Sequence, residues 1–183
     1  EESMISRESA LDLLKEWVKS ESLRRHCFAV ASAMESYAQN YHLTQEEIDA
    51  YWIAGLLHDF DYEKYPSLEH HPFQGVKVLE EEGFPDKIIQ AILSHGNHTG
   101  VKRESLMART LFAVDELCGL LMALSKVRPD GFATMVSASV EKALKKKDFA
   151  KAINRDDIEQ GIRDLGVKRE EHFQIIIHAL VRL

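Results

Sequence analysis

The stretch 51–59 most constrains how this chain can fold, because a nearly unbroken apolar segment runs directly into His58 and Asp59. Such a segment is expected to be buried, and burying an ionised carboxylate without a partner costs several kcal/mol. A divalent cation would provide that partner, and neutral imidazole is the commonest protein ligand of such ions. We therefore interpret His58 and Asp59 as a metal-binding pair. Taken alone, the dipeptide is better explained by a helix that ends at Leu57 with its polar exit residues in water.

Length and composition predict one globular domain, residues 1–183. A chain of 183 residues, 45% of them hydrophobic, can bury one core and is short for two. The net charge of −7 argues against a general binder of nucleic acid or of membrane surfaces. Cys27 and Cys118 lie in apolar helical patterns, which is typical of core residues in a reducing compartment. There is no apolar run of about 20 residues and no secretion signal in the acidic N-terminus, so we expect a soluble, cytoplasmic protein.

Apolar residues recur at intervals of three or four, and no segment shows the alternation typical of a strand. The sequence therefore predicts an all-α fold. Neighbouring residues of a regular helix point about 100° apart, so His58 and Asp59 can reach one ion only where the helix ends or is distorted. Ser6, the capping-box pattern at 44–47 and His71 before Pro72 mark helix starts. The expected helices span about 6–19, 22–37, 44–59, 71–83, 88–93, 104–124, 132–147, 148–153, 154–165 and 168–183.

Four further polar residues fall on inward faces or at helix ends. His26 lies within an apolar stripe, where a core histidine bonded to a carbonyl is the alternative. His71 and His95 lie at helix termini, where a side chain can face a cleft, whereas His98 is read as a surface residue. Asp115 has apolar neighbours three and four positions away on both sides, and a buried mid-helix aspartate needs a metal or a basic partner.

In this order the residues resemble the H…HD…H…H…D motif of the HD superfamily of metal-dependent phosphohydrolases. The resemblance is to the HDIG-type subgroup, although Phe60-Asp61 stands where that subgroup has Ile-Gly. It implies a helical bundle of the HD-domain type, with a core at about 20–125 and a C-terminal helical extension at about 126–183. It also implies two divalent ions (Fe, Mn, Ni, Zn, Co or Mg) bridged by Asp59. His70 or His71 could be the third histidine, and we choose His71 for its register with Gly75. The implied metal ligands are His26, His58, Asp59, His71, His95 and Asp115.

The resemblance implies hydrolysis of a small phosphorylated metabolite or nucleotide by a metal-activated hydroxide. In addition to the metal ligands, Asp61 or Glu63 would act as the acid that protonates the leaving group. A solvated loop explains both residues equally well. Alternatively, Asp61 or Glu63 could be a carboxylate that contacts a metal ligand rather than the metal. Arg25 could bind the substrate, as could Lys142 and Lys146 of the one basic cluster. A solvated helix end that complements the helix dipole is the favoured explanation of that cluster. We expect no long nucleic acid as a substrate, and the oligomeric state stays open.

Two other functions fit the same ligand set. The first is a di-iron oxygenase of the myo-inositol oxygenase type, which belongs to the same superfamily and would be distinguished by iron content and oxygen consumption. The second is a non-catalytic sensor on an HD scaffold, which a complete ligand set disfavours.

Overall fold

The computed structural model describes residues 5–183, and within that range the chain forms nine α-helices, one short 3-10 helix and no strand. The predicted all-α fold is confirmed. Residues 1–4 lie outside the described residues. They are part of the predicted domain and of the N-terminus in which no secretion signal was found. The helices are α1 (Arg7–Trp17), α2 (Glu21–Asn40), α3 (Gln45–Leu57), α4 (Phe73–Glu81), α5 (Asp86–Ser94), η1 (Asn97–Thr99), α6 (Leu106–Val127), α7 (Ser137–Lys145), α8 (Arg155–Leu165) and α9 (Arg169–Leu180).

The first helices begin where capping side chains satisfy their free amide groups. Ser6 accepts a hydrogen bond from the amide of Ser9, and Thr44 accepts one from the amide of Glu47. In both cases the side chain three residues on bonds back to the cap, which completes a capping box. Both predicted helix starts are confirmed.

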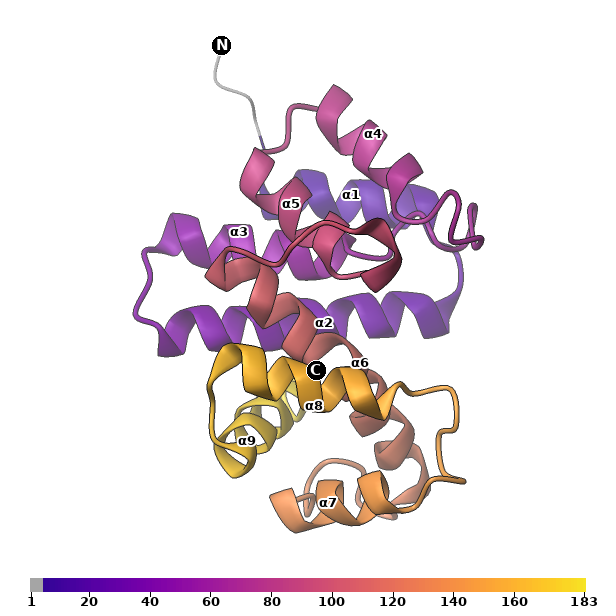
Figure 1. Ribbon diagram of the computed structural model, residues 1–183, viewed down its shortest axis with the longest axis vertical. Coiled ribbons are helices and arrows are strands. Elements are labelled where there is room, and N and C mark those ends of the chain that lie inside the picture. Colours follow the sequence, from indigo (N-terminus) through magenta and orange to yellow (C-terminus); the bar gives the residue numbers. More distant parts are fainter. Residues whose placement is uncertain (1–4) are drawn as a thin grey trace.

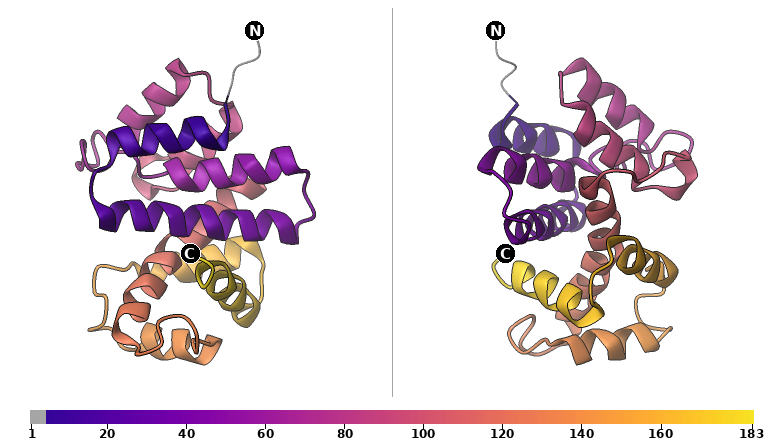
Figure 2. Two further views of the ribbon diagram at one scale, coloured as in Figure 1. Left: turned by 180° about the vertical axis from the view of Figure 1, so that it is seen from behind. Right: turned by 60° about the vertical axis from the view of Figure 1, so that its left-hand side comes forward.

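Helix α3 lies between α1 and α2, and α6 runs steeply across α2 (Figures 1 and 2). The helices α4 and α5 cover one side of this layer, while α7, α8 and α9 surround the second half of α6 (Figure 1). The buried apolar side chains form one connected cluster that includes residues of α1, α3, α6 and α9. The crossing of α2, α3 and α6 is therefore in the interior, where a polar side chain needs a partner.

The C-terminal third departs from the predicted helices. Residues 148–153 form turns rather than a helix, and α7 begins at Ser137 rather than at Phe132. The guanidinium group of Arg155 donates to the carbonyls of Lys146, Phe149 and Ala150. Because a side chain donates to these carbonyl groups, they do not need the backbone amide donors that a helix would provide. Arg128 similarly donates to the backbone and the hydroxyl of Thr134 before α7.

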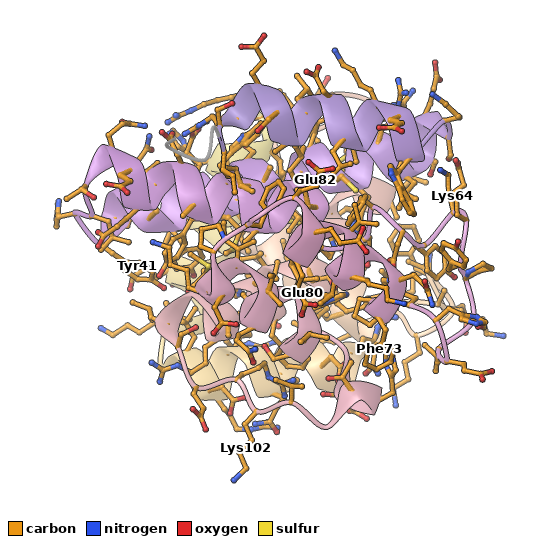
Figure 3. All side chains as sticks on the ribbon, turned by 90° about the horizontal axis from the view of Figure 1, so that it is seen from above. Tyr41, Lys64, Phe73, Glu80, Glu82 and Lys102 are labelled. Carbon is orange, nitrogen blue, oxygen red and sulfur yellow. The ribbon has the colours of Figure 1, made fainter. Side chains whose placement is uncertain are left out.

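Helix α4 also begins later than predicted. Pro72 occupies the N-cap position, so His71 is not the cap. The surface around α4 is charged: Glu80 and Glu82 are exposed, as are Lys64 and Lys102 on nearby segments (Figure 3). Among residues 5–183, no helix combines the length and apolarity that a membrane span requires.

Candidate metal centre

Helix α3 delivers His58 and Asp59 to the centre of the molecule. The helix ends one residue before His58, which confirms the predicted end of the helix at this pair. Gly55 lets α3 approach α2 closely, because a Cβ atom at this position would lie 2.8 Å from the Cα atom of Ala31. His58 consequently meets His26 of α2, with 3.2 Å between their Nε2 atoms.

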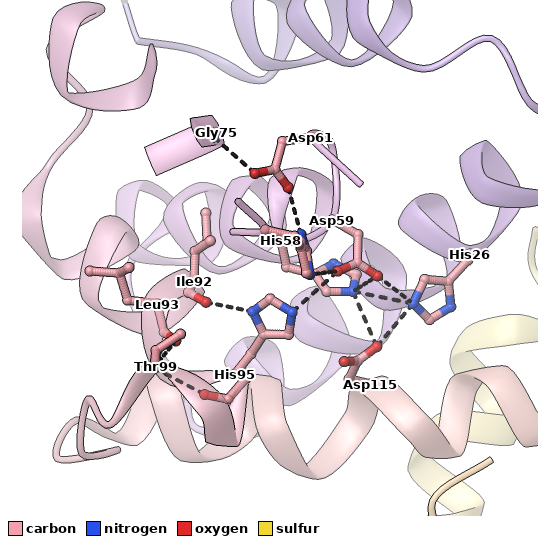
Figure 4. Close-up of polar contacts among 12 residues, drawn as sticks. His26, His58, Asp59, Asp61, Gly75, Ile92, Leu93, His95, Thr99 and Asp115 are labelled. Carbon is pink, nitrogen blue, oxygen red and sulfur yellow. Dashed lines mark hydrogen bonds and ion pairs between the residues drawn. The ribbon is translucent and has the colours of Figure 1, made fainter. Parts of the chain in front are cut away.

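The first group of converging side chains is His26, His58, Asp59 and Asp115 (Figure 4). Asp115 Oδ1, on α6, lies 2.9 Å from His26 Nε2 and 3.1 Å from His58 Nε2. Asp59 Oδ2 lies 3.2 Å from His58 Nε2 and 3.5 Å from His26 Nε2. One ligand atom of each of the four residues therefore faces a common point between α2, α3 and α6.

The second group is Asp59, His71 and His95. Asp59 Oδ1 lies 3.2 Å from His71 Nε2 and 3.2 Å from His95 Nε2. Asp59 thus directs one oxygen into each group. The neighbouring His70 is exposed and pairs with the hydroxyl of Ser67, so the structure brings His71 and not His70 to the cluster.

Three of the four imidazoles have their outer nitrogen engaged by an acceptor. His58 and His95 donate from Nδ1 to the backbone carbonyl three residues earlier, at 2.6 and 2.5 Å. His71 donates from Nδ1 to Asp61 Oδ1 at 2.6 Å. A proton on Nδ1 leaves the lone pair of Nε2 directed into the cluster, which is the arrangement that metal-ligating histidines show.

The spacing of the inward atoms fits a divalent ion. Two ligand atoms at right angles, each about 2.1 Å from an ion, are about 3 Å apart. The separations of 2.9 to 3.5 Å in the first group and of 3.2 Å in the second are close to this value. Imidazole nitrogen together with carboxylate oxygen suits iron, manganese, nickel, cobalt or zinc, so the residues present fit a metal centre.

The electrostatics of the cluster are governed by its two buried carboxylates, Asp59 and Asp115. Burial opposes the charged form of Asp59, yet the facing imidazoles, His58 first, hold its pKa well below the usual range. Asp115 behaves in the same way for the same reason. Burial likewise disfavours charge on His26 and His71, but contact with the aspartates raises the pKa of each to about 9. Without a metal, His26, His58 and His71 favour their protonated forms, and a divalent ion can replace those protons.

Asp61 does not face the cluster as the predicted proton donor should. It is buried, and Oδ1 accepts from His71 Nδ1 while Oδ2 accepts from the amide of Gly75 at 2.9 Å. A Cβ atom at Gly75 would lie 3.0 Å from the Asp61 carboxyl carbon, so only glycine allows this approach. The structure thus places Asp61 behind His71, in the position of the second role that the sequence allowed, and not at the cluster as a proton donor.

Glu63 is also placed away from the cluster. Its carboxylate accepts from the amides of Lys19 and Ser20 at 2.9 and 2.8 Å, immediately before α2. These backbone hydrogen bonds lower the pKa of Glu63, which favours its ionised form, a form with no proton to donate. The structure therefore does not bring Glu63 to the cluster as a proton carrier, and the residue ties the loop after α3 to the start of α2.

The predicted substrate-binding cations are divided by the fold. Arg25 precedes His26 on α2, and its side chain is exposed, with Glu21 at 3.7 Å. Lys142 and Lys146 are exposed at the end of α7, at the opposite end of the molecule from α4 and α5 (Figure 1). Arg25 thus adjoins the cluster residue His26 in the sequence only, whereas both lysines lie on or directly after another helix, α7.

Two residues near the cluster were not found from the sequence. Glu116, next to Asp115, accepts from the amide of Asn154; burial and the charge of Asp115 raise its pKa to about 7. His98, although exposed, donates to the backbone carbonyl of His71 at 2.7 Å. No periodicity or spacing signals either contact, because each one joins segments that are distant in the sequence.

Comparison with known families agrees with this geometry. A model of the HD domain matches residues 23–120, more than half of the chain. The chain therefore belongs to the HD domain family, the superfamily of HD metal-dependent phosphohydrolases. Members of this family are typically phosphohydrolases, and the His/Asp groups described here are consistent with metal binding. Neither curated proteins nor solved structures gave a significant match.

Proposed function

We propose that the chain is a metal-dependent phosphohydrolase acting on a small phosphorylated metabolite or nucleotide, with two divalent ions in its site. The observation behind the proposal is the orientation of Asp59, whose two oxygens face separate groups of ligand atoms. His26, His58 and Asp115 would complete the first site, and His71 and His95 the second. Two ions so placed would activate a water molecule and stabilise charge on the phosphoryl oxygens.

The protein's own contribution is to fix the ligands before the substrate arrives. The Nδ1 atoms of His58 and His95 are held by their own helices, and that of His71 by Asp61. Such prior orientation lowers the reorganisation needed during reaction. The net negative charge of the chain supports a small substrate over long nucleic acid, which is itself a polyanion.

The test is metal content per chain, followed by turnover. Protein purified without chelators is assayed for iron, manganese, nickel, zinc, cobalt and magnesium, and then against a panel of phosphoesters and phosphoanhydrides. About two ions per chain and hydrolysis that chelation abolishes support the proposal. One ion per chain would contradict the binuclear assignment and demote His71 and His95. Iron with oxygen uptake and no phosphate release would favour the oxygenase, and absence of any bound metal would favour the sensor.

A further inference from the structure

The backbone carbonyl of His71 accepts no backbone amide among the described residues, although it lies just before α4. In a continuous helix it would accept from the residue four positions on, which is Gly75. The amide of Gly75 instead donates to Asp61 Oδ2 (Figure 4). The carbonyls of the two residues that flank His71 do accept the amides four positions on, at 2.9 and 3.0 Å. The His71 carbonyl is therefore left to a donor from elsewhere in the chain.

His98 provides that donor. Its Nε2 atom donates to the His71 carbonyl at 2.7 Å, and the two imidazole rings are stacked with their planes 27° apart. The edge-on ring of Phe73 lies 6.1 Å from the His98 ring, between centroids. His71 is thus held at two points, since Asp61 binds its ring at Nδ1 and His98 binds its main chain.

The segment that carries His98 also carries the ligand His95, at the end of α5. The last carbonyls of α5 are fixed by side chains from further along this segment. The hydroxyl of Thr99 donates to the carbonyl of Leu93 at 2.8 Å (Figure 4), and the guanidinium of Arg103 donates to that of Ser94 at 2.8 Å. Free carbonyls at a helix end need such partners, so this end of α5 is a fixed base for His98.

Gly96 gives the His98 ring its room. A Cβ atom at position 96 would lie 2.7 Å from His98 Cε1, so a larger residue would push the ring away from its present place. With glycine there, the ring spans the space between the segments of His95 and His71, whose own rings lie 5.5 Å apart. One hydrogen bond therefore joins the two loops that supply the histidines of the second group.

We propose that His98 is a positioning residue of the second ion site. It ties the main chain of His71 to the segment of His95, so that both imidazoles keep their 3.2 Å distance from Asp59 Oδ1. The proposal rests on the two-ion site proposed above. Ligands on separate loops must be held within about 0.5 Å of their productive positions, and Asp61 alone fixes only the ring of His71.

Calorimetric titration of the metal-free protein with cobalt provides the first test. His98→Ala should weaken the second ion by about tenfold and leave the first unchanged, because contacts behind a ligand typically contribute about 10- to 100-fold in affinity. His98→Gln should restore most of this affinity, since its amide nitrogen can donate to the same carbonyl. His70→Ala is the matched control: His70 directly precedes His71, is exposed and contacts Ser67. Two wild-type affinities in His98→Ala would overturn the proposal.

Gly96→Ala tests the same contact without removing the donor. The added methyl group should displace the His98 ring, so Gly96→Ala should weaken the second ion about as much as His98→Ala does. In the double variant the ring is absent, and the two losses should not add. Fully additive losses would show that Gly96 acts on His95 independently of His98, and would contradict the proposed route.

The metal-free protein separates failure of this proposal from failure of the proposed function. The proton on His71 Nδ1, which Asp61 accepts, is followed by NMR through its exchange with water. Exchange should be at least about tenfold faster in His98→Ala than in wild type, His98→Gln or His70→Ala. If this difference is found in a protein that binds one ion or hydrolyses no ester, His98 remains the positioning residue of His71 and the two-ion enzyme is rejected. Equal exchange in all four proteins, with two ions bound by wild type, would reject the role of His98 and retain the enzyme.

Discussion

Two histidines, His58 and His172, are equally buried but lie in opposite surroundings. His58 faces two carboxylates, and these raise its pKa well above the ordinary value although burial opposes the charge. His172, on α9, accepts from the hydroxyl of Tyr37 and donates from Nε2 to the carbonyl of Ala113 at 3.0 Å. Burial lowers the pKa of His172 to about 4.

The difference shows what a buried histidine needs from its neighbours. Neutral His172 has both ring nitrogens satisfied by neutral groups, and its site is complete. The cluster around His58 contains two anionic carboxylates and reaches neutrality only by adding protons or a metal. Burial alone therefore does not identify a ligand; the carboxylates beside it do.

The largest effect is expected from a substitution that removes a negative charge from the cluster. Asp59→Asn removes the one carboxylate shared by both groups, so both ions should be lost and phosphoester hydrolysis should fall by about 10³-fold or more. Metal analysis and initial rates measure this, with circular dichroism to establish folding. Glu63→Gln is the control, since this acid of the same loop contacts backbone amides outside the cluster. Full metal content in Asp59→Asn would refute the bridging role.

Asp61→Ala should produce the next largest effect. The variant keeps all six inward residues but removes the acceptor for His71 Nδ1. Loss of such a carboxylate typically costs about 10- to 100-fold in metal affinity or activity. The loss of affinity should affect the second ion, the one bound by Asp59, His71 and His95. Calorimetric titration of the metal-free protein with metal would resolve the two sites. An equal loss at both sites would instead indicate general damage to the loop.

Substitution of the other buried histidine should affect stability and spare the metals. His172→Phe leaves the hydroxyl of Tyr37 and the carbonyl of Ala113 without their partners, at a cost of about 1 to 3 kcal/mol for each unsatisfied group. Urea unfolding measures the loss of unfolding free energy, and metal analysis should still find the wild-type content. Loss of metal in this variant would show that α9 controls the position of Asp115.

The pH dependence of stability should have opposite signs in the two regions. The pKa of His172 is 6.5 in the unfolded chain and about 4 in the folded one. The unfolded chain therefore binds a proton first, and the free energy of unfolding decreases as the pH drops from 6.5 to 4. For His26 in metal-free protein, the contribution is present below pH 6.5 and is lost as the pH rises through about 9. Unfolding of wild type and His172→Phe across this range measures the first effect: the wild-type advantage should shrink on acidification.

How far the sequence predicts the molecule depends on the range of the interaction. The helix caps at Ser6 and Thr44 are local patterns and were predicted. The six inward residues were found because an unpaired charge beside apolar residues is visible in the sequence and because their order resembles a family motif. The turns at 148–153 were missed because Arg155 binds their carbonyls. The position of Asp61 behind His71 depends on the close approach of Gly75, which no spacing reveals.

The smallest expected effect concerns the predicted basic residues. Lys142→Ala combined with Lys146→Ala should leave KM and kcat within about twofold of wild type, because exposed charges separated by more than about 10 Å are screened at ordinary salt concentrations. Arg25→Ala is the matched comparison, since Arg25 directly precedes His26 on α2. It should raise KM for a phosphomonoester more than it lowers kcat. If the two lysine substitutions raised KM as much as Arg25→Ala, the substrate would extend to α7, and the small-substrate assignment would have to be abandoned.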